Sequence, residues 1–197
     1  MSTRNLSLII ILAVILIFGG CACSGYNNLV SQDENVKKSW NNVQAEYQKR
    51  SDLVPNLVNT VKGAANFEQQ TLTNVIEARS KATSVKIDAS NLTPEKLAQF
   101  QQAQAGLTSA LGRLLAVAEA YPTLQATQNF KELQGQLESI ENDIRSSRQT
   151  FNESINDYNV KVRSFPMNIL SGAFGFHSKP GFVAEPGSDK APEVKFQ

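Results

Sequence analysis

The sequence has little from which a metal or redox site could be built. Its 197 residues include one histidine, His177, and two cysteines, Cys21 and Cys23. Both cysteines lie in the N-terminal apolar segment, so no disulfide can link the rest of the chain. A di-metal site in a helical bundle needs inward carboxylates and Glu-x-x-His pairs on facing helices, which one histidine cannot supply. We therefore expect neither a metal nor another cofactor.

The sequence also has no marked excess of one charge sign, and it lacks a nucleophile and base that could act together. The 19 Lys and Arg residues nearly balance the 18 Asp and Glu residues, so the chain lacks the positive field typical of nucleic-acid binding. Serine nucleophiles would have no histidine partner within the helical region. Gly106, Gly112 and Gly135 are isolated in helical patterns, where they indicate close helix contacts or weak points rather than a phosphate-binding loop. These absences favour a non-enzymatic protein.

The longest apolar run stands at the N-terminus. Leu6 to Phe18 reads LSLIIILAVILIF, and no charged residue occurs between Arg4 and Asp33. The fully apolar stretch has about 13 residues, the length of a signal-peptide core. Counting small residues up to Gly25 gives about 20, enough for a spanning helix. Residues 1–25 are therefore predicted to anchor the chain to membrane lipid.

Two anchoring chemistries fit this segment. Cys21 follows Phe18-Gly19-Gly20, which resembles a bacterial lipobox, although Phe18 stands where leucine is usual. The segment is thus either an uncleaved transmembrane helix or a lipoprotein signal with Cys21 acylated. The few early positive charges place the N-terminus in the cytoplasm. We expect a bacterial membrane protein whose folded part is periplasmic or extracellular.

Beyond Tyr26 the apolar residues recur at steps of three and four, as the buried stripe of a helix requires. No strand alternation of useful length occurs. The first stripe skips only Arg50 in its heptad-like register, and its residues are Val36, Trp40, Val43, Tyr47, Val54, Leu57 and Val61. We predict four long helices, over about Asn28–Lys62, Asn66–Val85, Thr93–Tyr121 and Asn129 to just before Pro166.

Local signals mark where these helices begin and end. Gly63 fits a C-terminal cap, and Thr93-Pro94-Glu95 combines a capping hydroxyl with proline and an acid in the first turn. Pro122 should stop the third helix. Asn129, with Glu132 three residues later, resembles a capping box that would open the fourth.

Short links between these helices predict an all-α fold, an antiparallel up-and-down four-helix bundle over residues 26–166. The end of the fourth helix then returns to the level of the membrane. Residues 167–197 form an apolar juxtamembrane segment and a polar tail. The apolar stretch Phe165–Phe176 either packs on the base of the bundle or touches lipid headgroups. From Ser178 onward, the many prolines and the low apolar content of the chain predict disorder.

Pro55 is the least expected residue within a predicted helix. Proline removes the hydrogen bond to the carbonyl four residues earlier, here that of Ser51, and normally kinks a helix. The kink either lets the first helix wrap its neighbours or opens a polar notch. Such a notch, formed by Arg50, Asp52, Pro55 and Asn56, would be a candidate site for a partner protein or peptide.

The pattern as a whole resembles the LemA family of bacterial membrane proteins. Tyr26–Gly63, reading YNNLVSQDENVKKSWNNVQAEYQKRSDLVPNLVNTVKG, is similar to the family's opening signature. LGRLLAVAEAYP at Leu111–Pro122 and the run Ser146–Phe176 are similar to its third and fourth helices. The resemblance implies an N-terminal anchor and a helical bundle outside the cytoplasm. It also implies a family with no assigned enzymatic activity, and it adds no catalytic residues.

Three functions follow as hypotheses. The leading one is a non-enzymatic interaction or scaffold protein of the bacterial envelope, with envelope proteins as partners. The second is an envelope enzyme or enzyme cofactor that uses carboxylates such as Asp52 or Glu119. The third is membrane remodelling by bundles that self-associate.

Overall fold

The computed structural model of the chain describes residues 3–63 and 68–183. These residues form six α-helices and one 3-10 helix, with no strand among them. In chain order the elements are α1 (Thr3–Lys62), α2 (Gln69–Ser84), η1 (Ala89–Asn91), α3 (Pro94–Ala118), α4 (Pro122–Gln125), α5 (Gln128–Arg163) and α6 (Met167–Leu170). The prediction of an all-α fold with four long helices is confirmed.

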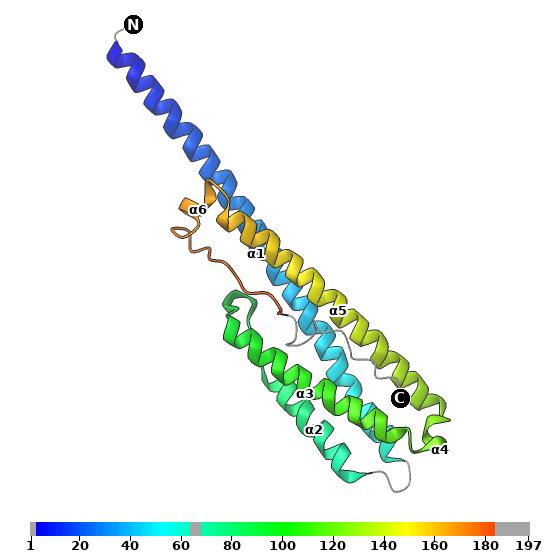
Figure 1. The fold of residues 1–197 in the computed structure, drawn as a ribbon. Coiled ribbons are helices and arrows are strands. Elements are labelled where there is room, and N and C mark those ends of the chain that lie inside the picture. The colour runs from blue at the N-terminus through cyan, green and yellow to red at the C-terminus, as the bar shows by residue number, and fades with distance from the viewer. Residues whose placement is uncertain (1–2, 64–67, 184–197) are drawn as a thin grey trace, which may run out of the picture.

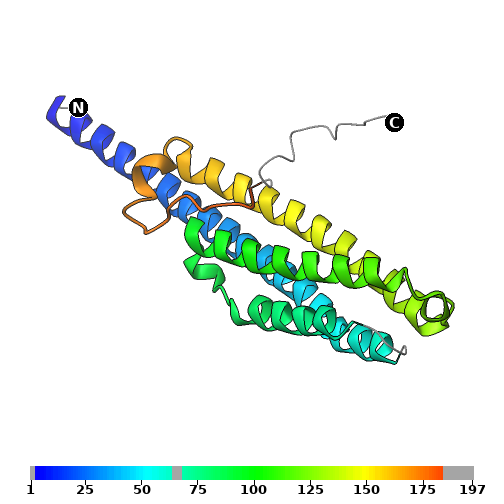
Figure 2. The ribbon, with the colours of Figure 1, turned by 60° about the horizontal axis from the view of Figure 1, so that its bottom comes forward.

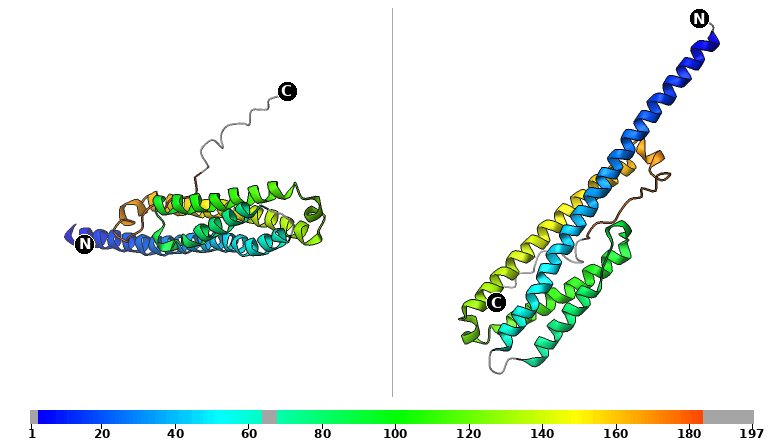
Figure 3. Two further views of the ribbon diagram at one scale, coloured as in Figure 1. Left: turned by 90° about the horizontal axis from the view of Figure 1, so that it is seen from below. Right: turned by 180° about the vertical axis from the view of Figure 1, so that it is seen from behind.

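The four long helices lie side by side, and each runs opposite to the next along the chain (Figures 1 and 2). α1 packs most closely against α5, and α2 packs most closely against α3. The N-terminal part of α1 projects alone beyond the other helices, as the view from behind also shows (Figure 3).

The first helix is much longer than predicted. α1 runs without a break from Thr3 to Lys62, so the predicted start at Asn28 is wrong and the boundary between residues 25 and 26 falls inside one helix. No proline interrupts the backbone between Phe18 and Asn28, and the glycines at positions 19, 20 and 25 are all part of the helix. Across the residues that the structure describes, none of the helices combines the length and apolar character needed to cross a membrane.

The predicted stripe of α1 forms the core. All seven of its apolar residues are buried, and they divide between two clusters that meet near Arg50. One cluster surrounds Trp40 beside α5, and the other surrounds Leu57 beside α2 and α3. Burial of a large apolar side chain contributes about 1.5–3 kcal/mol, so this stripe holds the long helices together.

The predicted cap of α3 is confirmed, whereas that of α5 is wrong. The Thr93 hydroxyl accepts a hydrogen bond from the Lys96 backbone N–H at 3.3 Å. For α5, the capping residue is Thr127, whose hydroxyl accepts from the Phe130 backbone N–H at 3.4 Å. Asn129 is already helical. Thr127 stands three residues before its donor, Phe130, which is the spacing of a helix N-cap, and it follows the short helix α4 closely.

The apolar stretch after α5 is divided between the core and the surface. Met167 is buried against Gly25 of α1, where an added Cβ would come within 2.3 Å of the Met167 methyl carbon. Phe165 and Ile169 are 77% and 63% exposed. The stretch therefore packs on α1 through one side chain and presents other large apolar groups to the surroundings.

The prediction of disorder from Ser178 is wrong for residues 178–183, which we call the tail segment. It has no helix or strand and runs from α6 beside α1 toward the start of α3 (Figure 1). Phe182 is buried, with its ring centroid 5.4 Å from that of Phe151 and 5.9 Å from that of Trp40. A single aromatic side chain thus fixes the segment in the core. The rest of the predicted disordered tail, residues 184–197, lies outside the described residues.

Candidate functional site

The four residues of the predicted polar notch do not come together. Asp52, Pro55 and Asn56 are exposed, whereas Arg50 is 1% exposed and points into the interior. The Ser51 carbonyl, which Pro55 leaves without its helical donor, accepts a hydrogen bond from Arg79 Nε of α2 at 2.7 Å. The polar group freed by the proline is thus used inside the protein, to join α1 to α2.

Arg50 occupies the stripe position that apolar residues fill elsewhere on α1. Its Nη1 donates to Thr108 Oγ1 at 2.7 Å and to Glu141 Oε1 at 2.8 Å. Its Nη2 donates to Gln104 Oε1 at 2.7 Å. The guanidinium also lies over the Tyr47 ring, 4.9 Å from its centroid. One buried cation therefore joins α1 to α3 and α5.

This network is not fully satisfied. Arg50 Nε is buried and has no hydrogen-bond partner among the described residues. The side chain of Glu141 remains 31% exposed, so the ion pair is buried on one side only. A buried charge requires a partner because its desolvation is costly, and Glu141 supplies that partner.

A groove lies above Arg50, between α3 and α5. These two helices are not among the closely packed pairs of the described chain, and the space between them has a volume of about 840 Å³. We call it the α3–α5 groove. Leu111 and Leu115 line it from α3, and Leu137 and Ile144 from α5. Arg50 and Glu141 lie among its lining residues, with Arg145 and Arg148.

The tail segment is bound at one end of this groove through side-chain amides. Asn159 accepts from the Lys179 backbone N–H at 2.8 Å and donates to its carbonyl at 2.9 Å. Asn152 accepts from the Phe182 backbone N–H at 2.8 Å and donates to its carbonyl at 3.1 Å. From α3, Gln101 donates to the Val183 carbonyl at 3.1 Å. These contacts recognise main chain and do not depend on the identity of the bound side chains.

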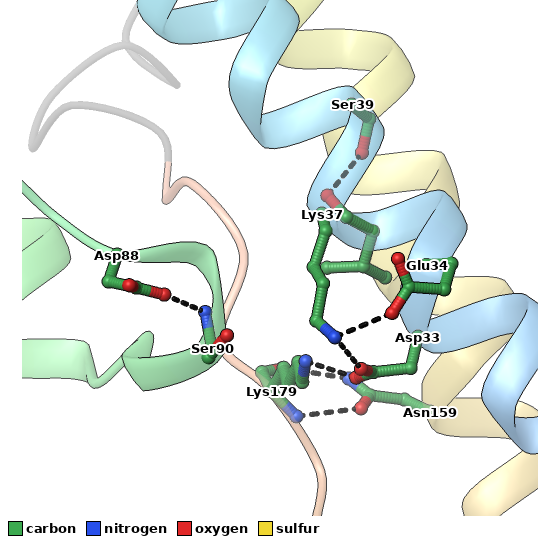
Figure 4. Close-up of polar contacts among 9 residues, drawn as sticks. Asp33, Glu34, Lys37, Ser39, Asp88, Ser90, Asn159 and Lys179 are labelled. Carbon is green, nitrogen blue, oxygen red and sulfur yellow. Dashed lines mark hydrogen bonds and ion pairs between the residues drawn. The ribbon is translucent and has the colours of Figure 1, made fainter.

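An ion-pair cluster holds the start of the tail segment against α1 (Figure 4). Lys179 Nζ pairs with Asp33, and Lys37 Nζ lies 2.9 Å from the other oxygen of the same carboxylate. The Lys179 ammonium also lies 5.1 Å from the Tyr158 ring centroid. Burial and the neighbouring Asp33 raise the pKa of Tyr158 to about 12, so it stays neutral.

Protonation of Asp33 is expected to weaken this cluster. Burial raises the pKa of Asp33, but hydrogen bonds from Lys179 and Lys37 outweigh burial and hold it below its ordinary 3.8. A lowered pKa stabilises the fold above the ordinary value and loses that contribution as pH falls through the folded pKa. Asp33→Asn should cost about 1 kcal/mol at neutral pH, and the difference from the natural protein should shrink as pH falls below 3.8 and vanish once Asp33 is protonated in the folded state. Chemical denaturation at neutral pH and across the acid range measures it.

Glu34→Gln is the matched control for Asp33→Asn. Glu34 also pairs with Lys37, at 2.7 Å, but its side chain is 63% exposed. An exposed pair of this kind contributes about 0.3–0.5 kcal/mol. Equal losses for the two variants at neutral pH would contradict a special role for Asp33 in holding the tail segment.

The remaining candidate residues lie apart from this region. Asp52 and Glu119 are both exposed, on α1 and just after α3. His177 is exposed beyond α6. Cys21 lies in the projecting part of α1, where its side chain is outside the description, and Cys23 is exposed. Within residues 3–63 and 68–183, no cluster of His, Cys, Asp or Glu could hold a metal ion.

Sequence reasoning missed Arg50 as an interior residue and missed Gln104 as its partner. Arg50 falls in the register of the first apolar stripe, and Gln104 falls at the same spacing between Phe100 and Leu107, so register was a usable signal. Glu141 offers no comparable signal, because it stands beside the apolar register of its helix, one residue after the partly buried Ile140 of α5. The isolated glycines were also informative, because a Cβ at Gly106, Gly112 or Gly135 would meet no atom within 4 Å. They therefore mark open surface rather than close helix contacts.

The chain is similar in sequence to known proteins over most of its length. The chain is 26% identical, over 183 residues, to magnetosome protein MamQ 2 of Paramagnetospirillum magneticum. It is 27% identical to magnetosome protein MamQ of Magnetospirillum gryphiswaldense over the same length. Each alignment covers 83% of this chain but 66% of the relative, so the chain spans slightly less than two thirds of these proteins.

A smaller relative and a family match complete the comparison. The chain is 22% identical over 161 residues to protein LemA of Metamycoplasma hominis, covering 81% of this chain and 70% of that protein. The LemA family matches residues 39–196, which include the rest of α1 from Ser39, all later helices and the tail segment. The resemblance seen in the sequence is confirmed, and the chain belongs to the LemA family.

Proposed function

We propose that this protein is a non-enzymatic, membrane-anchored interaction or scaffold protein of the bacterial envelope. Its folded part is an antiparallel up-and-down four-helix bundle outside the cytoplasm. The observation that carries the proposal is the α3–α5 groove, a hollow of about 840 Å³ on the bundle at the place where Arg50 joins α1 to α3 and α5. A preformed concave surface with apolar lining and a few polar groups is typical of binding sites.

Attachment to the membrane is supported by the placement of apolar groups. The apolar N-terminal segment is the first part of α1, and Phe165 and Ile169 are exposed beside the point where α1 leaves the other helices. Large exposed apolar side chains gathered at one end of a molecule favour contact with lipid. The attachment is through the N-terminal segment, with Cys21 as the residue that acylation would modify.

A binding role is better supported than catalysis by the carboxylates. An envelope enzyme that uses carboxylates would need two of them buried close together, because burial and a close partner tune their pKa values for catalysis. Asp52 and Glu119 are exposed and stand on separate elements. No Asp or Glu in the described part of the chain is fully buried. The names of the relatives, magnetosome protein MamQ and protein LemA, state no reaction.

Crosslinking in intact cells tests the proposal. Photoreactive residues placed at exposed positions of α3 and α5 should capture specific envelope proteins, and the adducts should sediment with the membrane fraction. A mass measurement of the mature N-terminus identifies acylation at Cys21 in the same preparation. If no position captures a specific protein under several irradiation regimes, the interaction role is wrong.

A further inference from the structure

Most of the large apolar side chains that the described chain exposes gather at one end of the molecule. Three lie on the projecting part of α1, between residues 11 and 16. Four more lie around the point where α1 leaves the other helices, and we call them the basal patch: Tyr26, Phe165, Ile169 and Phe174. The ring centroids of Tyr26 and Phe174 are 5.3 Å apart, and Phe165 lines a hollow together with Gly25 of α1. An exposed apolar cluster of this kind marks an interaction site.

The basal patch stands on a fixed support. Three of its four members belong to residues 164–176, which we call the basal loop and which contain α6 (Figure 1). Met167 of this loop is buried against Gly25 of α1, and Leu170 packs partly buried against the core. The Ser171 hydroxyl donates to the Val162 carbonyl of α5 at 3.3 Å. One side of the loop is therefore held by α1 and α5, while the other side presents apolar groups outward.

The basal patch lies where either form of the N-terminal anchor would meet the bilayer surface. The uncharged stretch from Leu6 to Gly25 has about 20 residues, which as a helix extends about 30 Å, the thickness of the hydrocarbon core. Tyr26 would then stand at the boundary, where tyrosine is enriched. Acylation of Cys21 would place the surface about 8 Å further toward the N-terminus. Both anchors bring the basal patch to the headgroup region.

The charged residues next to the basal loop are basic. Lys161 and Arg163 are exposed in the last turn of α5, directly before the loop. In the sequence, no acid occurs between Asp157 and Glu185. Within the described chain, neither Lys161 nor Arg163 forms an ion pair with a carboxylate. Cations beside an apolar face are attracted to anionic lipid headgroups.

A lipid surface suits this patch better than a protein partner or a second copy of the chain. The patch lies around α1, which is the same helix that begins with the apolar N-terminal run. When that run is anchored, any other occupant of the patch would have to displace lipid from beside the anchor. Continuity with the anchor therefore favours the bilayer itself.

We propose that the basal loop inserts Phe165, Ile169 and Phe174 into the interface of the bilayer, and that Lys161 and Arg163 bind anionic headgroups there. This second contact fixes how the bundle stands on the membrane, which the N-terminal anchor alone leaves free. The inference rests on the proposed membrane attachment and deepens it, because it names the residues and the lipid class.

Tryptophan quenching in vesicles tests the contact. The full chain is reconstituted in vesicles of phosphatidylcholine and phosphatidylglycerol, with or without bromine near the headgroup end of the acyl chains. Bromine quenches only nearby indoles, so Phe165→Trp and Ile169→Trp should each add emission that brominated lipid reduces by at least about half. Trp40, which is buried in the core, supplies a background that is measured in the natural protein.

Ile76→Trp is the matched control. Ile76 is also a large exposed apolar residue, but it lies on α2. Arg79, about one turn later, donates to the carbonyl of Ser51, which is about 38 Å along α1 from Tyr26. The emission added by Ile76→Trp should therefore be the same in brominated and ordinary vesicles.

Charge variants test the lipid class. In vesicles of phosphatidylcholine alone, the quenching of Phe165→Trp should fall about twofold, because the headgroup attraction is lost. Adding Lys161→Glu and Arg163→Glu together should lower it similarly in the anionic vesicles. Lys131→Glu is the control, since Lys131 is exposed near the opposite end of α5. Equal quenching in neutral and anionic vesicles would overturn the assignment to anionic lipid.

The outcomes separate this inference from the proposed function. If the chain floats with vesicles but Phe165→Trp and Ile169→Trp are quenched no more than Ile76→Trp, the basal loop does not contact lipid and the inference is wrong. Attachment through the N-terminal segment would then still stand. Crosslinking of the basal loop to a second copy or to another protein, without quenching, would likewise overturn the inference. If the chain does not float with vesicles at all, the proposed attachment fails as well.

Discussion

Replacing Arg50 with alanine is expected to lower the free energy of unfolding by about 2–5 kcal/mol, the range for replacing a large buried side chain with alanine. The variant removes the hydrogen bonds by which α1 reaches Thr108 of α3 and Glu141 of α5. It also leaves the buried Gln104 without a donor for its side-chain oxygen. Thermal or urea unfolding followed by the helical circular dichroism signal measures the loss.

Arg50→Met distinguishes charge from volume. Methionine fills much of the same space without a charge, and Glu141 can turn toward solvent because it is already 31% exposed. We expect Arg50→Met to cost about half as much as the alanine variant. Adding Glu141→Leu should recover part of that cost, since apolar replacement of both members of a buried pair is often neutral. A loss below about 1 kcal/mol for Arg50→Ala would contradict a structural role for the network.

Trp40→Ala is expected to destabilise the protein by about 3–5 kcal/mol, as large-to-small substitutions of buried aromatics do. Trp40 is fully buried, and its ring centroid lies 5.3 Å from those of both Phe100 and Phe151. Its Nε1 donates to the Ile87 carbonyl at 3.1 Å, which fixes the loop before α3. The loss should also release the tail segment, because Phe182 packs on the same ring.

Trp40→Phe is the control, with an expected cost below about 2 kcal/mol. Phenylalanine keeps most of the ring contacts, and the Ile87 carbonyl keeps its second donor, Gln44 Nε2, at 3.1 Å. Hydrogen exchange at Phe182 reports whether the tail segment stays bound in each variant. Equal destabilisation by both variants would show that the indole hydrogen bond, and not packing, dominates at this position.

The core of α1 could be predicted because a helix repeats every 3.6 residues, so register alone places Val36, Val43 and Leu57 on one face. Arg50 stands in the same register, yet its charge argued for the surface. Its interior position depends on Glu141, 91 residues further along the chain. Nothing in one sequence specifies which acid will approach that arginine, so the network could be found only in the folded structure.

The tail segment shows a second limit of sequence reasoning. Its prolines and low apolar content predict disorder, and one phenylalanine does not change that average. Phe182 is nevertheless buried because Trp40 and Phe151, on different helices, leave a site of matching shape. The predicted cap of α5 was wrong for a more local reason, since Thr127 and Asn129 are equally suitable capping residues two positions apart. Composition and propensity cannot resolve alternatives that tertiary packing decides.

The continuity of α1 has a mechanical consequence. One helix of 60 residues extends for about 90 Å, and it lacks a joint between its projecting part and the part that packs on α5. From its contact with Met167 at Gly25 to its end at Lys62, the helix extends about 55 Å. A tilt of about 10° about Gly25 would therefore displace Lys62 by about 10 Å. α1 would therefore act as a lever, and Arg50, about two thirds of the way from Gly25 to Lys62, would pass a displacement of the projecting part directly to α3 and α5.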